Sequence, residues 1–148
     1  MKKTILIING PNLNMLGKRE PEVYGKKTLN DIDKLLINLD KNNNIIVDCF
    51  QSNIEGEIID KIQQACGMIH GIIINPAAYT HTSVAIHDAL KAVDLPAVEV
   101  HISNIGAREE FRGESLTAPA CIATIAGLGV DGYEWALRSL VKLHNTVV

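Results

Sequence analysis

The 148-residue sequence contains few aromatic side chains, no long apolar run and no excess of positive charge. No apolar run approaches the ~20 residues that a membrane-spanning helix needs, and Met1-Lys2-Lys3 leads straight into a short strand pattern rather than a signal peptide. The formal net charge is -3 and charges of both signs are dispersed, which disfavours nucleic-acid and membrane partners. We therefore expect a soluble, cytoplasmic protein.

Metal-binding and nucleotide-binding motifs are also missing. The cysteines are odd in number, form no C-x-x-C pair and stand in apolar surroundings, which favours reduced structural thiols: Cys49, Cys66 and Cys121. Gly127, Gly129 and Gly132 spell G-x-G-x-x-G, but a dinucleotide site also needs a further strand and an acidic residue about twenty positions later. We interpret these glycines as a turn and expect neither a metal nor an organic cofactor.

Strand and helix patterns alternate along the whole chain. Apolar, β-branched runs predict strands over 4–9, 45–50, 69–75, 97–102 and 121–126. Helical spacing predicts helices over 82–93 and 131–144, and two capping boxes, Thr28 with Asp31 and Ser52 with Glu55, predict the starts of two more. The alternation predicts a flavodoxin-like α/β fold: a doubly wound, five-stranded parallel sheet in the order 2-1-3-4-5 with helices on both faces. A single catalytic domain over 1–148 fits this length.

A long loop follows the first predicted strand, from residue 9 to residue 25. Prolines, glycines and asparagines interrupt any period there, so we expect no regular structure. Such a loop is either a solvated connection or functional, and open α/β sheets bind ligands beyond the carboxyl ends of their strands. The loop carries Asn12, Arg19 and Tyr24. In the predicted strand order they flank a crevice that is lined by the strand ends Asn9, Asn75 and His101.

Glu99 and His101 form a candidate acid/base pair. Two residues apart on a strand, they share a face, and a carboxylate beside an imidazole orients it and raises its basicity. The alternative is a half-exposed polar face on an edge strand. The run 75–83 adds an amide, an imidazole and hydroxyls that suit a small carboxylated or polyhydroxylated ligand, although each hydroxyl alone could be a turn or cap residue.

Tyr24 could act as a base only if cations stabilise its phenolate, because a phenol ordinarily titrates near pH 10. Arg19 is the obvious cation, being five residues away. Arg108 and Arg112 add positive charge in the irregular segment 103–120, where glutamates offset it. A solvated charge run is the alternative interpretation of that segment.

These residues lie in motifs that resemble the type II 3-dehydroquinate dehydratases, and the resemblance covers nearly the whole chain. The motifs are Asn9-Gly10-Pro11-Asn12-Leu13-Asn14, Arg19-Glu20-Pro21-Glu22-Val23-Tyr24-Gly25, Asn75-Pro76-Ala77-Ala78-Tyr79-Thr80-His81-Thr82-Ser83, Glu99-Val100-His101-Ile102-Ser103-Asn104 and Arg108-Glu109-Glu110-Phe111-Arg112.

The resemblance implies dehydration of 3-dehydroquinate to 3-dehydroshikimate in the shikimate pathway, by anti elimination through an enolate. It implies that Tyr24, its phenolate stabilised by Arg19, removes the C2 proton, and that Asn12 positions a water against the enolate. His101, oriented by Glu99, would protonate the departing C1 hydroxyl. Substrate-binding roles would fall to Asn75, His81, Ile102, Ser103, Arg112 and, across a subunit interface, Asp88. The resemblance further implies no cofactor and a homo-oligomer of trimers gathered into a dodecamer.

Two other hypotheses fit the predicted fold. A flavodoxin-like module that binds a flavin or a phosphorylated ligand would account for the sheet, but not for Tyr24 or the pair of Glu99 and His101. A purely structural oligomer is the other hypothesis, which a measured activity would exclude.

Overall fold

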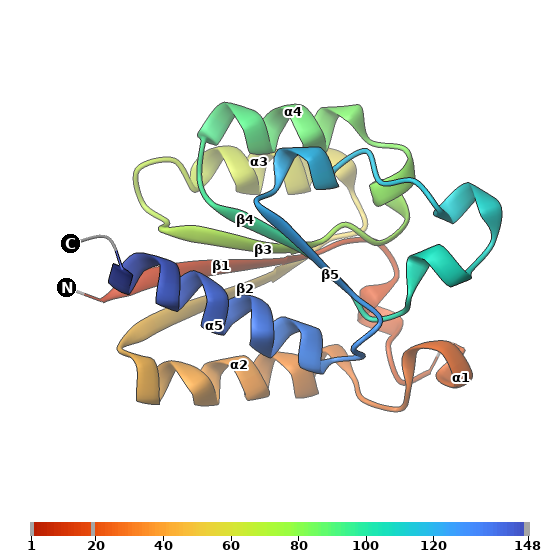
Figure 1. Cartoon of the computed structure of the whole chain (residues 1–148), viewed down its shortest axis with the longest axis horizontal. Helices are drawn as coiled ribbons and strands as arrows, with labels where there is room; N and C mark the ends of the chain where they lie inside the picture. The colour runs from red at the N-terminus through yellow and green to blue at the C-terminus, as the bar shows by residue number, and fades with distance from the viewer. Residues whose placement is uncertain (1, 19, 147–148) are drawn as a thin grey trace.

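The computed structural model describes residues 2–18 and 20–146 (Figure 1). Within these residues the chain forms one sheet of five strands, all paired in parallel, in the order β2-β1-β3-β4-β5. The strands are β1 (Lys3–Asn9), β2 (Ile45–Gln51), β3 (Gly71–Asn75), β4 (Ala97–His101) and β5 (Ala123–Ala126). The predicted fold class and strand order are confirmed.

Helices cover both faces of the sheet. One face carries α2 (Leu29–Asn43) and α5 (Asp131–Thr146), and the other carries α3 (Glu55–Gln64) and α4 (Val84–Val93) (Figure 1). Alternate residues of β1 serve the two layers: Ile5 and Ile7 belong to the core under α2 and α5, whereas Leu6 and Ile8 belong to the core under α3 and α4. A strand buried on both faces must be apolar throughout, which explains the unbroken apolar run.

The two predicted capping boxes have different outcomes. Thr28 and Asp31 form theirs, with the Asp31 N–H 3.2 Å from Thr28 Oγ1 and the Thr28 N–H 2.9 Å from Asp31 Oδ2. The box of Ser52 with Glu55 is wrong, because the Ser52 N–H still continues the sheet by donating to the Asn9 carbonyl at 3.1 Å. The N-cap of α3 is Ile54, and the Ser52 hydroxyl accepts from the Ile54 N–H at 3.0 Å.

Three predicted elements begin two residues late because a turn uses their first N–H groups. The Ile69 N–H closes a turn on the Ala65 carbonyl at 3.0 Å, so β3 starts after it. The Cys121 N–H does the same on Ala118 at 2.9 Å, ahead of β5. Thr82 ends a 3₁₀ turn, and α4 follows with a serine cap.

The two loops expected to be irregular contain short helical turns, so that expectation is wrong. The turns of the first loop are Leu13–Met15 and α1 (Pro21–Tyr24). Those of the second loop are Ile105–Ala107, Glu110–Arg112 and Ala118–Ala120. The loop after β1 and the first part of the segment after β4 lie beyond the carboxyl ends of the strands, at the same end of the sheet, whereas Ala118–Ala120 lies beside α4 (Figure 1). Gly127 and Gly129, at φ 88° and 62°, lie in the turn between β5 and α5. The fold thus places the candidate site residues at one edge.

The cysteines differ in their surroundings. Burial raises the pKa of the Cys49 and Cys121 thiols to about 12. Cys66 is exposed, so its predicted apolar environment is wrong. Among the described residues no helix is both long and apolar enough to cross a bilayer.

Candidate active site

A pocket of about 210 Å³ opens at the carboxyl edge of the sheet. Its lining includes most of the predicted site residues: Asn12, Tyr24, Asn75, His81, His101, Ile102, Ser103 and Arg112. It also includes Arg108, which the sequence marked only as positive charge. The ends of β3 and β4 and the loops after β1, β3 and β4 therefore contribute to one cavity.

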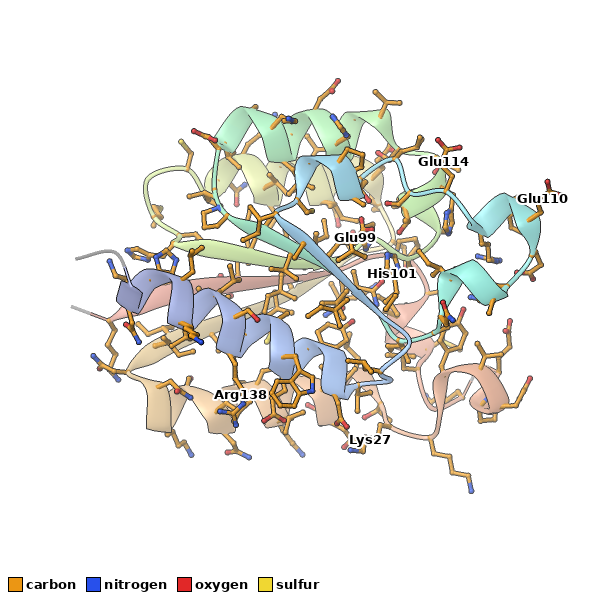
Figure 2. The ribbon with its side chains drawn as sticks, in the orientation of Figure 1. Lys27, Glu99, His101, Glu110, Glu114 and Arg138 are labelled. Carbon is orange, nitrogen blue, oxygen red and sulfur yellow. The ribbon has the colours of Figure 1, made fainter. Side chains whose placement is uncertain are left out.

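The pair of Glu99 and His101 lies at the end of β4, which runs between β3 and β5 (Figure 2). Glu99 is 0% exposed and His101 is 4% exposed. The alternative of a half-exposed polar face on an edge strand is therefore wrong. His101 Nε2 lies 3.0 Å from Glu99 Oε2, and an ionised carboxylate can only accept this bond. The bond leaves Nδ1 as the ring nitrogen available to a molecule in the pocket.

Two hydroxyl groups also donate hydrogen bonds to the Glu99 carboxylate. Ser115 Oγ donates to Oε2 at 2.9 Å, and Thr117 Oγ1 makes a short hydrogen bond to Oε1. Burial acts to raise the pKa of Glu99, but the hydrogen bonds from His101, Thr117 and Ser115 outweigh burial and hold the pKa below its ordinary value of 4.5. Glu99 is consequently ionised at neutral pH, although solvent does not reach it. The sequence analysis missed both hydroxyls, because hydroxyls in an irregular segment are usually turn residues.

Tyr24 contacts a cation, Arg108, from the segment that follows β4. Arg108 Nη1 donates to the Tyr24 phenol oxygen at 2.7 Å, and the guanidinium carbon stands 5.4 Å from the centre of the ring. The Arg108 side chain also lies 3.8 Å from carboxylate oxygens of Glu20 and of Glu109. The predicted partner, Arg19, lies outside the described residues. Local spacing pointed to Arg19, whereas Arg108 is 84 positions from Tyr24 in the sequence.

Asn12 is held by the end of β2. It has a left-handed backbone, at φ 68°, and its N–H donates to Asn53 Oδ1 at 2.9 Å. Gln51 Nε2 donates to the same Asn53 oxygen and to the Gly10 carbonyl, at 3.2 Å each. A Cβ on Gly10 would lie 2.5 Å from the Pro76 carbonyl oxygen, so only glycine lets β1 and the end of β3 approach this closely. Gln51, the last residue of β2, and Asn53 were not among the predicted site residues.

The polar groups on the far side of the pocket are partly engaged. His81 Nδ1 is 2.7 Å from the Glu114 carbonyl, which can only accept, so Nδ1 carries a proton and Nε2 faces no partner from this bond. Arg112 Nε donates to Glu109 Oε2 at 2.8 Å. These residues, with the end of β4, surround the pocket with groups suited to carboxylates and hydroxyls.

Two described candidates, Glu99 and Asp88, are not among the lining residues. Glu99 lies behind the lining and contacts it through His101. Asp88 lies exposed on α4, outside the lining residues. Across residues 2–18 and 20–146, no group of three or more His, Cys, Asp or Glu side chains could hold a metal ion.

Three comparisons identify similar proteins. Residues 3–141 match the family described as dehydroquinase class II. A 3-dehydroquinate dehydratase of Endomicrobium trichonymphae is 59% identical over 141 residues, which cover 95% of this chain and 99% of that protein. A catabolic 3-dehydroquinase of Talaromyces marneffei is 56% identical over 135 residues, covering 91% and 77%. The crystal structure of a type II dehydroquinase from Butyrivibrio crossotus superposes with a TM-score of 0.92 at 50% identity, covering 94% and 97%.

The hydrogen bond from Thr117 to Glu99 predicts a pH-dependent loss of stability in Thr117→Val. At pH 7 the variant should unfold about 1.5–3 kcal/mol more easily, the usual worth of a hydrogen bond to a charged group. Because the folded-state pKa of Glu99 is lowered, its ionised form stabilises the fold above pH 4.5, and this contribution disappears as the pH falls through the folded value. The difference between variant and wild type should therefore shrink in acid. Urea unfolding at a series of pH values measures it.

Thr124→Val, the same change at an exposed position of β5, is the matched control and should be nearly neutral. If Thr117→Val lost no more stability than this control, the hydrogen bond to Glu99 would not stabilise the fold.

Proposed function

The chain belongs to the class II dehydroquinase family, whose members are hydro-lyases, and on this premise we propose that it dehydrates 3-dehydroquinate to 3-dehydroshikimate in the shikimate pathway. One observation carries the proposal: Tyr24 and His101 line the same pocket. Tyr24 accepts a hydrogen bond from the Arg108 guanidinium, and His101 is hydrogen-bonded to the buried carboxylate of Glu99. Eliminating water next to a ketone needs a base, a stabiliser for the enolate and an acid. The alternative of a flavin or phospho-ligand module is not favoured, since the family and the relatives are dehydroquinases.

Tyr24 is the base that removes the C2 proton as a phenolate. The 2.7 Å hydrogen bond from Arg108 supports this role, because a positive charge at the phenol oxygen favours the phenolate over the phenol. Arg19, to which the family resemblance gives the same task, is a second cation in the proposal. Proton abstraction moves the negative charge from the phenolate to the substrate's carbonyl oxygen, as an enolate.

Asn12 holds the water that stabilises the enolate. The bond from its N–H to Asn53 fixes the left-handed turn from which the side chain extends at the pocket. A donor that is preorganised where charge develops lowers the barrier without reorganisation during the reaction.

His101 is the acid. It gives its proton to the C1 hydroxyl, which leaves as water while the enolate collapses to the conjugated enone. Ionised Glu99 supports this step because its hydrogen bond to Nε2 orients the ring and leaves Nδ1 for the substrate. At the end Tyr24 has gained a proton and His101 has lost one, and exchange with solvent resets both.

The remaining lining residues bind the substrate. Together they hold its carboxylate and hydroxyls, as the family resemblance implies: Asn75, His81, Ile102, Ser103 and Arg112. The proposed chemistry uses only side chains and water, without a metal or an organic cofactor. The free cysteines fit a reducing compartment, and we place the enzyme in the cytoplasm.

We propose a homo-oligomer in which Asp88 serves the pocket of a neighbouring subunit. The position of Asp88 supports this, since it is exposed on α4 and lies outside the pocket of its own chain. Trimers gathered into a dodecamer are the expected assembly. Light scattering should give a mass several times 16.1 kDa, and an active particle of one chain would contradict the role of Asp88.

The direct test is the rise in ultraviolet absorbance of the conjugated enone when purified protein meets 3-dehydroquinate. His101→Ala should lower turnover by roughly 10²–10⁴-fold, the usual worth of a positioned acid, with a smaller change in substrate affinity. Glu99→Gln should be milder because the imidazole keeps its place. Wild-type protein that produced no enone would contradict the function, and near wild-type turnover in His101→Ala would contradict the acid assignment.

Tyr24→Phe should be nearly inactive yet fold normally, because it removes a single oxygen from a partly exposed side chain. Arg108→Ala should lower kcat, because the guanidinium that donates to the phenol oxygen is lost. Arg19→Ala should lower kcat in the same way. Turnover is measured at saturating substrate, with Arg138→Ala on the outer side of α5 as the matched control (Figure 2). Wild-type kcat in Arg108→Ala would contradict the role of this cation.

A further inference from the structure

Behind the pocket, three buried polar side chains connect β1, β3 and α5. The Tyr133 hydroxyl lies 2.6 Å from Asn9 Oδ1, and Asn75 Nδ2 lies 2.9 Å from the same hydroxyl. Asn9 is 1% exposed, Asn75 is 3% exposed and Tyr133 is 0% exposed. Asn9 and Asn75 are register partners at the carboxyl ends of neighbouring strands. Of the three, Asn75 lines the pocket.

The donors and acceptors of this network allow one orientation of the Asn75 amide. The Tyr133 hydroxyl has one proton, which it gives to Asn9, so it must accept from Asn75 Nδ2. At the other end of the amide, the Ala77 N–H lies 3.1 Å from Asn75 Oδ1 and can only donate. Both bonds fix the same orientation, and the second Nδ2 proton remains for a molecule in the pocket.

The same amide holds a strained turn in the pocket wall. Ala77 lines the pocket and has a left-handed backbone at φ 53°, a conformation that costs a residue other than glycine some free energy. Its N–H is bound by Asn75 Oδ1, whose partner Nδ2 is in turn bound by Tyr133. The Tyr133 hydroxyl therefore affects both the N–H donor that Asn75 presents to the pocket and the backbone conformation of Ala77 in the pocket wall.

Tyr133 itself is fixed by the helix that carries it. The Tyr133 N–H donates to the Val130 carbonyl at 3.2 Å, and the ring is part of the core under α2 and α5. Just before it, a Cβ on Gly132 would lie 3.3 Å from Val100, so the first turn of α5 packs closely on β4. Burial raises the pKa of Tyr133 above its usual range, which keeps the hydroxyl protonated.

We propose that Tyr133 is a positioning residue for substrate recognition: its hydroxyl turns the Asn75 amide so that the pocket presents an N–H donor, and thereby selects an acceptor such as a carboxylate. This inference rests on the proposed function. The ring alone would fill the core, because phenylalanine has the same ring. The hydroxyl is required by the two asparagines, which would otherwise keep a buried acceptor and a buried donor without partners.

The test is Tyr133→Phe, assayed with 3-dehydroquinate. A donor that binds substrate and transition state equally affects KM more than kcat. We expect KM to rise about tenfold, the upper worth of one neutral hydrogen bond, with kcat changed by less than about twofold. Asn75→Ala should raise KM by a similar factor. Adding Tyr133→Phe to Asn75→Ala should change KM by less than about twofold, because the residue through which the hydroxyl acts is already gone.

Leu140→Ala is the control for general destabilisation. It removes a core side chain of the same helix at the opposite end of β3, where Leu140 lies beside Gly71. It should lower the melting temperature at least as much as Tyr133→Phe while leaving KM unchanged. The proposal is overturned if Leu140→Ala raises KM equally, if Tyr133→Phe leaves KM at the wild-type value, or if the effects of Tyr133→Phe and Asn75→Ala multiply in the double variant.

A second readout is independent of turnover. In ¹⁵N-labelled protein the side-chain amide protons of Asn75 should exchange slowly with solvent, and Tyr133→Phe should speed this exchange at least tenfold, a shift of about 1.4 kcal/mol. Wild-type protein inactive on 3-dehydroquinate would overturn the proposed function, and the amide exchange would still decide whether Tyr133 orients Asn75. Unchanged exchange in Tyr133→Phe would overturn the present proposal even if the wild-type enzyme is active.

Discussion

The ionised carboxylate of Glu99, buried in the sheet, constrains the segment that follows β4. A charge removed from solvent is tolerated only if hydrogen-bond donors replace the water it has lost. One donor comes from His101 on the same strand, and the others come from Ser115 and Thr117, which reach Glu99 only if the segment after β4 folds back over the carboxyl edge. That segment also carries Arg108, so the contact that keeps Glu99 charged also brings a guanidinium to the loop after β1.

The sheet was predictable from the sequence because each of its layers leaves a periodic signal. Both cores draw on alternate residues of the same strands, and the residues at helical spacing in the last helix, Tyr133 and Leu140 among them, are buried. The errors lie where a single hydrogen bond decides the boundary. Ser52 carries a good capping signal, but its N–H is already committed to Asn9 across the sheet. A local pattern contains no information about such a distant partner.

The site was predictable as far as chemistry follows from residue type at a strand end. Tyr24 and His101 share a pocket, as their positions after parallel strands suggested. The supporting residues were not predictable in the same way. Arg108, Thr117 and Tyr133 act through partners that are distant in the sequence or lie on another element, so their chemistry depends on how the loops and α5 fold back. The spacing of Tyr133 with Leu137 and Leu140 is typical of a core face, which is right for its ring and gives no information about its hydroxyl.

The candidate base and the candidate acid are carried by elements of very different local stability. Every residue of β4 is buried between two neighbouring strands, whereas the four residues of α1, all of them described, include no buried side chain. Segments with few buried contacts open at a small fraction of the free energy of global unfolding. On warming, α1 would therefore open while the sheet is still intact. The working temperature range of such an enzyme is then set by a single turn of helix and its contact with Arg108, and the melting temperature of the fold overstates it.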